Sequence, residues 1–171
     1  NRVCHKGIGR TFQIPRPFHN LTLLENVALS AFFGRDRAVT QQQAWAYAEE
    51  ALALVGLPVD PRATTAGLGA AALKKLELAR ALATQPRLLL ADESLNGLDH
   101  GEMESAADML QRIRREKNIT IVWVEHIMGV LMRVVDRVVV LDHGEVIFTG
   151  APKDAQNDRR VVEVYLGAEA M

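Results

Sequence analysis

Several features are scarce in this chain of 171 residues, and each scarcity argues against a class of protein. Cys4 is the only cysteine, which rules out an internal disulfide and fits a reducing compartment. No apolar run approaches the roughly 20 residues that a membrane helix needs, and no signal-peptide pattern is present, so any membrane link is expected through a partner. The chain has 20 basic and 21 acidic residues, so it lacks the excess of positive charge that binds nucleic acids or anionic lipids.

The composition that remains is that of one globular domain. The length suits a single domain, and a hydrophobic content of 49% can build a real core. The chain begins at Asn1 rather than at a methionine, within sequence that reads as structured. We therefore expect an N-terminal truncation.

Helices and strands alternate along most of the chain. Thr22 and Glu25 form a capping-box pattern that opens a helix, and Gly34 is expected to end it. The run LLLA at 88–91 follows a proline and is too short for a helix, which favours a strand. The other expected elements are a strand within 7–14, helices over 40–55, 71–84 and 100–116, strands over 119–124, 137–142 and 145–150, and a short helix near 158–166.

This order of elements predicts an α/β fold. Strands that alternate with helices imply a parallel sheet. The continuous apolar runs imply strands that are buried on both faces. Residues from about 15 to 70 contain helices without strands, and we expect them to form a helical insert between the first strand and the main sheet.

Two of the expected strands end in groups able to do chemistry. Residues 88–91 run into Asp92 and Glu93, and residues 119–124 run into Glu125 and His126. Ligands of open α/β sheets bind beyond the carboxyl ends of the strands, so parallel neighbours would bring these groups together. Phosphate hydrolysis needs a carboxylate that holds metal and a group that positions water. Asp92 suits Mg²⁺, Glu93 could polarise the attacking water, and His126 could contact the terminal phosphate.

Each of these residues also has an ordinary structural explanation. An acidic pair after a strand is often a solvated loop cap, and a single histidine is more often structural than catalytic. Asp99 and Glu102 form a capping box for the next helix. Gln13 could be a polar residue at a strand end, and Glu125 a surface acid.

The order of the motifs resembles an ATP-binding-cassette (ABC) ATPase subunit over nearly the whole chain. The pieces are GIGRTFQ (7–13), a helical insert, LKKLELARAL (73–82), LLLADE (88–93), NGLD (96–99) and the pair EH (125–126). The stretches LTLLENVALSAF and ELARALATQPRLLLADE and the terminal VYLG are most like the branched-chain amino acid importer type. The resemblance implies a partial P-loop NTPase-type (RecA-like) parallel sheet, with a helical subdomain inserted after the Q-loop.

The resemblance also implies a role for each matching residue. Gln13 matches the Q-loop glutamine, which in the family touches Mg²⁺ and water and relays to the membrane subunit. Asp92 matches the metal-associated aspartate of the Walker B strand, and Glu93 matches the catalytic glutamate. Asp99 matches the D-loop aspartate, which works across the dimer, and His126 matches the switch histidine.

The chain departs from the family at the phosphate-binding loop. The family motif G-x-x-x-x-G-K-[ST], the Walker A segment, would precede Gln13, and its amides and lysine hold the phosphates. Residues 5–12 (HKGIGRTF) carry glycine and lysine in the wrong order and spacing. The family's adenine-stacking aromatic residue is missing as well. The chain is therefore expected to be unable to bind ATP alone, although its family is one of ATPases.

A second departure lies in the signature loop, where the family has a Leu-Ser-Gly-Gly-Gln type segment. The matching residues lack the serine hydroxyl and the glutamine, and alanines add a Cβ where glycine lets the backbone approach a phosphate. An Ala-rich helix N-terminus would still offer free amides, so we expect weakened engagement of the partner's nucleotide. The residues of this degenerate loop are Leu68, Gly69, Ala70, Ala71 and Ala72.

The resemblance leads to a domain plan and a function. Residues 1–14 are expected to be a remnant of the N-terminal core, 15–72 the helical subdomain that ends at the signature loop, 73–150 the catalytic core, and 151–171 a helical tail. The function expected is that of the ATPase subunit of an ABC importer for branched-chain amino acids or related solutes, with ATP and Mg²⁺ as cofactors. Its partners would be a second ATPase subunit and transmembrane permease subunits, at the cytoplasmic face of the inner membrane, and no nucleic acid.

Two other functions are weighed against this one. A non-catalytic regulatory or interaction module fits the missing phosphate loop and the altered signature loop. The retention of Gln13, Asp92, Glu93 and His126 counts against it, since such a module has no chemical need for all four. A DNA-repair type of ABC ATPase predicts a long coiled-coil insertion, which the insert of about 55 residues does not contain.

Overall fold

The computed structural model describes residues 2–35 and 37–166, and the chain divides into two compact units, residues 1–126 and 127–171. The expected division at residues 14, 72 and 150 stays a prediction. None of the described helices is long and apolar enough to cross a membrane.

The described residues of the first unit form a short parallel sheet and four α-helices. The strands β1 (Ile8–Arg10), β2 (Leu88–Asp92) and β3 (Thr120–Val124) lie in the order β1-β2-β3, and both pairings are parallel. A 3-10 turn, η1 (Cys4–Lys6), precedes β1. The helices are α1 (Leu23–Phe33), α2 (Gln41–Val55), α3 (Ala70–Ala83) and α4 (His100–Lys117).

Local sequence signals decide where these helices begin and end. The Thr22–Glu25 capping box is formed at the start of α1, and the Asp99–Glu102 capping box is formed at the start of α4. The second helix ends at Gly56, whose φ of 68° lies in the left-handed region that glycine adopts at low cost. Both predicted capping boxes are therefore confirmed.

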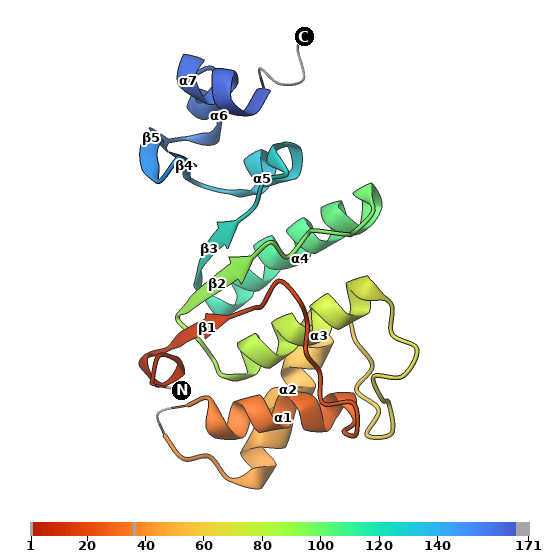
Figure 1. Cartoon of the computed structure of the whole chain (residues 1–171). Helices are drawn as coiled ribbons and strands as arrows, with labels where there is room; N and C mark the ends of the chain where they lie inside the picture. The colour runs from red at the N-terminus through yellow and green to blue at the C-terminus, as the bar shows by residue number, and fades with distance from the viewer. Residues whose placement is uncertain (1, 36, 167–171) are drawn as a thin grey trace. The chain divides into compact units, whose positions relative to one another are not determined.

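The helices α1 and α2 of the helical insert pack on each other and on α3, the next helix in the chain (Figure 1). Their shared core includes Val27, Ala48, Leu52 and Leu76, none of which is more than 1% exposed. The expected absence of strands in the insert holds for its described residues, apart from one isolated bridge between Thr22 and Thr64.

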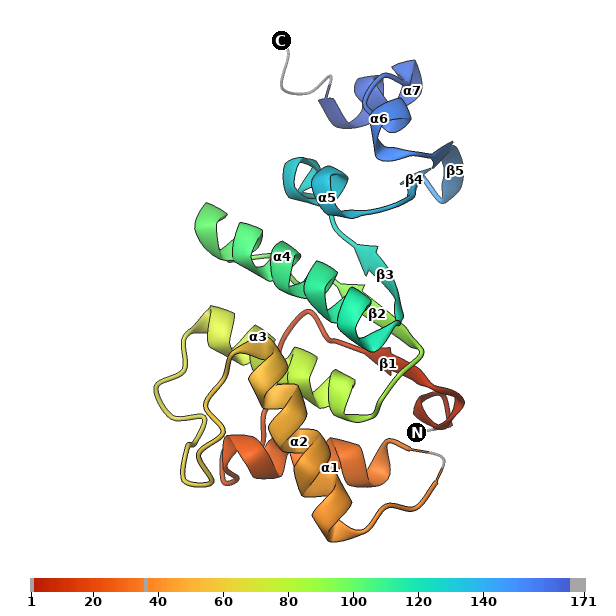
Figure 2. The same cartoon turned by 180° about the vertical axis from the view of Figure 1, so that it is seen from behind.

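The sheet is covered by helices on one face. Figures 1 and 2 show α4 behind β2 and β3 in one view and in front of them in the other. Leu89 is fully buried, and Ile121 and Trp123 pack against the same core. Val122 and Val124 point the other way and are 48% and 57% exposed, because no described element of this unit covers that face. The expectation that every strand is buried on both faces is therefore wrong for β3. It is also wrong for the strand at residues 138–142, where Val139 and Leu141 are exposed.

The first strand lies within residues 7–14, as expected, but it is short. Pairing with β2 covers Ile8–Arg10, and one further bond joins the Thr11 amide to the Leu90 carbonyl at 3.0 Å. Beyond that point Phe12 and Ile14 leave the sheet and are exposed.

The second unit is built on a β-hairpin. It contains α5 (Met128–Val134), β4 (Val138–Asp142), β5 (Glu145–Gly150), α6 (Pro152–Ala155) and α7 (Arg159–Val161), followed by a π-helical turn, η2 (Val162–Leu166). The two strands form their own antiparallel sheet, and the hairpin turn at residues 142–145 is where the sequence predicts it. Its small core consists of Met132, Val138, Val140, Ala155 and Val161. The expected helix over 158–166 is split between α7 and η2.

Candidate functional site

The carboxyl ends of the three parallel strands meet at one edge of the sheet. Arg10 is in register with Leu90, and Asp92 is in register with Val124. The segments that leave β1, β2 and β3 therefore start at the same edge. The predicted adjacency of the strands that carry Asp92 and Glu125 is confirmed.

Glu93 is held by segments that leave both neighbouring strands. Gln13, on the segment after β1, donates a hydrogen bond from its side-chain amide to the Glu93 carboxylate. The backbone amide of Glu93 donates to the carbonyl of Val124, the last residue of β3, at 2.9 Å. Asn96 adds a longer contact of 3.5 Å to the same carboxylate. The structure thus brings Gln13 and Glu93 together.

The backbone of Glu93 is in an unusual conformation. Its φ is +42°, in the left-handed region that side-chain-bearing residues seldom occupy. Such a conformation costs of order 1–3 kcal/mol and persists only where surrounding contacts determine it. The turn after β2 is therefore held by its neighbours rather than by its own preference.

Asp92, the last residue of β2, pairs with Arg10 on β1. The Arg10 guanidinium lies 2.9 Å from the Asp92 carboxylate, and the two side chains are 55% and 37% exposed. Pairs this open to water contribute little to stability. A cation with a higher charge density than the guanidinium could displace Arg10 from Asp92. Arg10 was not singled out by the sequence.

Glu125 is not a simple surface acid. Its Oε1 accepts from the Leu95 amide at 2.7 Å and from the Trp123 indole at 3.2 Å. It therefore fixes the segment that follows Glu93. His126 follows it at the same edge, is exposed, and has no hydrogen-bond partner among the described residues.

Lys74 on α3 is a site residue that the sequence reasoning missed. Its ammonium group donates to the Glu93 carbonyl at 3.2 Å and to the Ser94 carbonyl at 3.1 Å. Burial lowers the pKa of Lys74, and the charges of Glu125 and Glu93 oppose part of this shift. The sequence contains a signal for this position, namely the spacing of four residues between Lys74 and the buried Leu78, which places both on one helix face.

A second charged group on α3 contacts the segment that carries Gln13. Glu77 is only 6% exposed and pairs with Arg80 at 2.9 Å. Burial raises the pKa of Glu77, while Arg80 and a hydrogen bond from the Phe12 backbone act against the shift. Arg80 also donates to the Arg16 carbonyl at 3.0 Å. The helix therefore holds the segment after β1 as well as the turn after β2.

The residues of the degenerate signature loop form the start of α3. Gly69 is the N-cap, with a φ of −72° and no side-chain hydrogen bond to the helix. Ala70 is the first helical residue and is exposed, and a Cβ on Gly69 would meet no atom within 4 Å. The structure thus contains an Ala-rich helix N-terminus at this position. Asp99 is occupied in its capping box.

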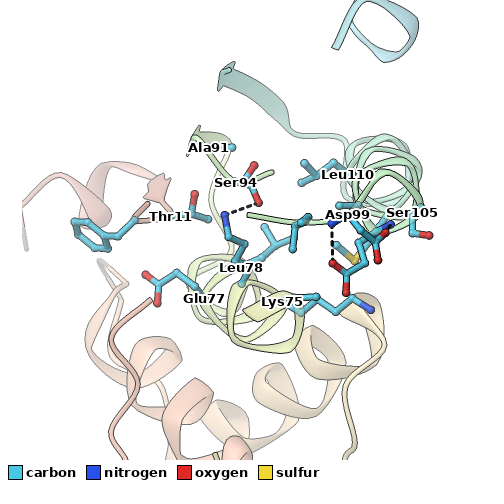
Figure 3. A pocket seen from close by; sticks show the side chains of 17 residues that line it. Thr11, Lys75, Glu77, Leu78, Ala91, Ser94, Asp99, Ser105 and Leu110 are labelled. Carbon is cyan, nitrogen blue, oxygen red and sulfur yellow. Dashed lines mark hydrogen bonds between the residues drawn. The ribbon is translucent and has the colours of Figure 1, made fainter. Parts of the chain in front are cut away.

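A cavity of about 420 Å³ lies between α3, β2 and α4. In Figure 3, Thr11 and Glu77 lie on one side of it, Asp99 and Ser105 on the other, and Leu78 between them. Its walls are largely apolar, and the Lys74–Ser94 hydrogen bond closes part of its boundary.

Comparison with known proteins gives matches over almost the whole chain. The family model described as ABC transporter matches residues 1–96, and the model for the branched-chain amino acid ATP-binding cassette transporter matches residues 145–171. The high-affinity branched-chain amino acid transport ATP-binding protein BraF of Pseudomonas aeruginosa is 28% identical, over 98% of this chain and 70% of its own length. LivG of Salmonella typhi, which carries the same description, is 29% identical over 97% of this chain and 70% of its own length.

Solved structures show the same fold. The ADP form of MJ1267, an ATP-binding cassette of an ABC transporter, has a TM-score of 0.80 and 26% identity, over 97% of this chain and 70% of its own. The ATP-binding cassette MJ0796, bound to ADP and phosphate as a dimer, has a TM-score of 0.71 and 29% identity, over 85% of this chain and 62% of its own. The expected P-loop NTPase-type fold is confirmed. The chain therefore belongs to the ABC transporter family, and it is similar to the ATP-binding subunits of the branched-chain amino acid type.

Proposed function

We propose that the chain is part of the ATP-hydrolysing subunit of an ABC importer for branched-chain amino acids or related small solutes. The observation that carries the proposal is the hydrogen bond between Gln13 and Glu93, made across the strand ends beside Asp92. Hydrolysis of a phosphate needs a group that holds metal and a group that positions water, and Asp92 and Glu93 are residues of these kinds. The branched-chain substrate class rests on the relatives' descriptions and on the family match over residues 145–171.

The residues present fit a Mg²⁺ ion. The part of the chain that the structure describes contains no cluster of three or more His, Cys, Asp or Glu side chains. Mg²⁺ is nevertheless commonly held by one or two carboxylates, with waters and substrate phosphates completing its shell. Asp92 and the amide oxygen of Gln13 are ligands of that kind, and the ion would neutralise charge on the phosphates.

Each remaining residue has a role in this proposal. Glu93 accepts a proton from the attacking water, and Gln13 orients its carboxylate. His126 contacts the terminal phosphate, and Asp99 works at the contact with the second subunit. The amides at the start of α3 face the nucleotide held by that subunit. They bind it more weakly than the family's signature loop does, because Gly69 and its alanine neighbours lack the usual side-chain donors.

The segment after Gln13 is the proposed contact with the permease. Phe18 is 50% exposed and Ile14 is 67% exposed, and large apolar groups open to water often mark an interaction surface. Packing within the insert accounts for Leu21, which is half-buried. In this arrangement the protein lies on the cytoplasmic face of the inner membrane, bound through the permease.

Two experiments test the proposal. In the complete subunit, Glu93→Gln should retain ATP binding and nearly abolish hydrolysis, while Glu116→Gln on the exposed face of α4 should retain both. Equal turnover in the two variants would refute the assignment. The second experiment is a thermal melt of this chain with and without Mg-ATP, in which a ligand at about 100 times its Kd would stabilise by about 2.7 kcal/mol. An unmoved melt supports the proposal that the chain does not bind ATP alone.

The rival function is a non-catalytic interaction module. The altered residues 69–72 favour it, since they offer the partner's nucleotide only backbone donors. The same Glu93→Gln experiment separates the two, because a module that does not hydrolyse ATP has no turnover to lose.

A further inference from the structure

The turn that carries Glu93 is held from two sides by opposite charges. On one side, the Lys74 ammonium binds the carbonyls of Glu93 and Ser94. On the other side, the Glu125 carboxylate accepts from the Leu95 amide. Three consecutive residues are thus fixed through their backbones, and this explains how Glu93 keeps a left-handed φ of +42°.

Lys74 makes the only side-chain hydrogen bonds that join α3 to this turn among the described residues. It lies five residues after Gly69, about 7.5 Å along the helix at 1.5 Å per residue. A helix this short is stiff, so a displacement of its first turn displaces Lys74 as well. The Glu93 carbonyl also accepts from the Asn96 amide at 3.3 Å, but that bond lies within the turn and does not connect it to the helix.

We propose that Lys74 is a positioning residue for Glu93, which couples the start of α3 to the hydrolytic carboxylate through the backbone of residues 93–94. The inference rests on the proposed function for its catalytic consequence, but the contact itself does not. When the start of α3 meets a nucleotide on the second subunit, Lys74 sets the angle at which the Glu93 side chain faces the water. Lys74 itself touches no reacting atom.

The first arm of the test is hydrogen exchange on this chain, without nucleotide. Lys74→Met keeps an unbranched side chain that ends at Cε and removes the ammonium donor, and Lys75→Met is the matched control one residue away. Hydrogen bonds to a charged group stabilise a structure more than hydrogen bonds between neutral groups do. Loss of the Lys74 bonds should therefore accelerate exchange of the amides of residues 93, 95 and 96 about tenfold. The control should leave these rates unchanged, and unchanged rates in Lys74→Met would overturn the proposal.

The second arm is steady-state ATP hydrolysis by the complete subunit. Lys74→Met should lower kcat about tenfold while KM for ATP changes less than about twofold, as expected for a group felt only when the water is activated. Lys74→Arg, which can still donate to both carbonyls, should recover most of kcat, and Lys75→Met should match the parent. An equal kcat in Lys74→Met and Lys75→Met would overturn the proposal.

The two arms separate this inference from the proposed function. If Glu93→Gln leaves turnover intact, the proposed function fails, whatever Lys74 does. If Glu93→Gln abolishes turnover and Lys74→Met does not lower it, the function stands and the positioning role fails. If Lys74→Met loses its cooperative melt, Lys74→Gln decides through the same exchange rates, because its shorter side chain cannot reach both carbonyls. These rates should rise above the parent values, and parent values would overturn the proposal.

Discussion

Asn26 is the polar side chain on which the shape of the segment before α1 depends. It is fully buried, and its Oδ1 accepts from the Phe18 amide at 2.8 Å. Its Nδ2 donates to the carbonyls of Phe18, Leu21 and Thr22 at 3.0, 3.3 and 2.9 Å. One side chain thus closes the loop that leads from the Gln13 segment into the helical insert.

The cost of Asn26→Ala can be worked out group by group. The Phe18 carbonyl also accepts from the Leu21 amide, and the Thr22 carbonyl from the Asn26 amide, so both keep a partner. The Phe18 amide and the Leu21 carbonyl keep no other hydrogen bond among the described residues, and a polar group left without a partner away from water costs about 1–3 kcal/mol. Adding the small void left by the side chain, we expect a loss of about 2–4 kcal/mol in the free energy of unfolding.

The assay is urea denaturation of the parent and three variants. Asn26→Asp keeps the acceptor for Phe18 but places a carboxylate against three carbonyl oxygens, so it should cost at least as much as Asn26→Ala. Asn20→Ala, at an exposed position in the same loop, should stay within about 0.5 kcal/mol of the parent. The reasoning is refuted if Asn26→Ala matches Asn20→Ala, or if Asn26→Asp is the milder of the two substitutions.

Three further predictions concern the core, the pH dependence and the start of α3. Leu89→Ala should lower the free energy of unfolding by about 2–5 kcal/mol, because Leu89 is fully buried, while Leu141→Ala at a 55% exposed position should cost far less in the same urea titration. Burial raises the pKa of Glu77 in the folded chain. The contribution of Glu77 to the free energy of unfolding is therefore complete below the ordinary glutamate pKa and is lost as pH rises through the raised folded-state pKa. Urea titrations between about pH 4 and 7 should show this decline in the parent and not in Glu77→Gln, and an equal slope in both would contradict it. Gly69→Ser adds an N-cap at a position open to a Cβ, so thermal melts should show a gain of a few tenths of a kcal/mol, and a loss above about 1 kcal/mol would contradict the geometry.

Sequence reasoning succeeded where the signal is local. Capping boxes at Thr22 and Asp99, the stop at Gly56 and the hairpin turn at 142–145 depend on residues within one turn of each other. The convergence of Asp92 and Glu93 with the pair Glu125–His126 was also predictable, because parallel strands place their carboxyl ends at one edge. The roles of these residues in hydrolysis stay predictions.

The same reasoning failed where partners are distant in the chain. An apolar run cannot say which face of a strand is covered, and β3 proved open on the face of Val122 and Val124. The helical spacing in α2 predicts one apolar stripe of Trp45, Ala48, Leu52 and Val55. The structure buries the last three and leaves Trp45 only half-buried. Burial of this kind depends on which elements pack nearby.

The sequence by itself determined the order of the elements, the ends of most helices and the set of side chains at the strand ends, since these follow from short-range geometry. Only the tertiary structure decided how that set is held. Lys74 reaches the turn of Glu93 across 19 residues, Glu125 reaches Leu95 across 30, and Gln13 reaches Glu93 across 80. A side chain's hydrogen-bond partner is whatever the packed chain brings within about 3 Å, and no local pattern records that distance.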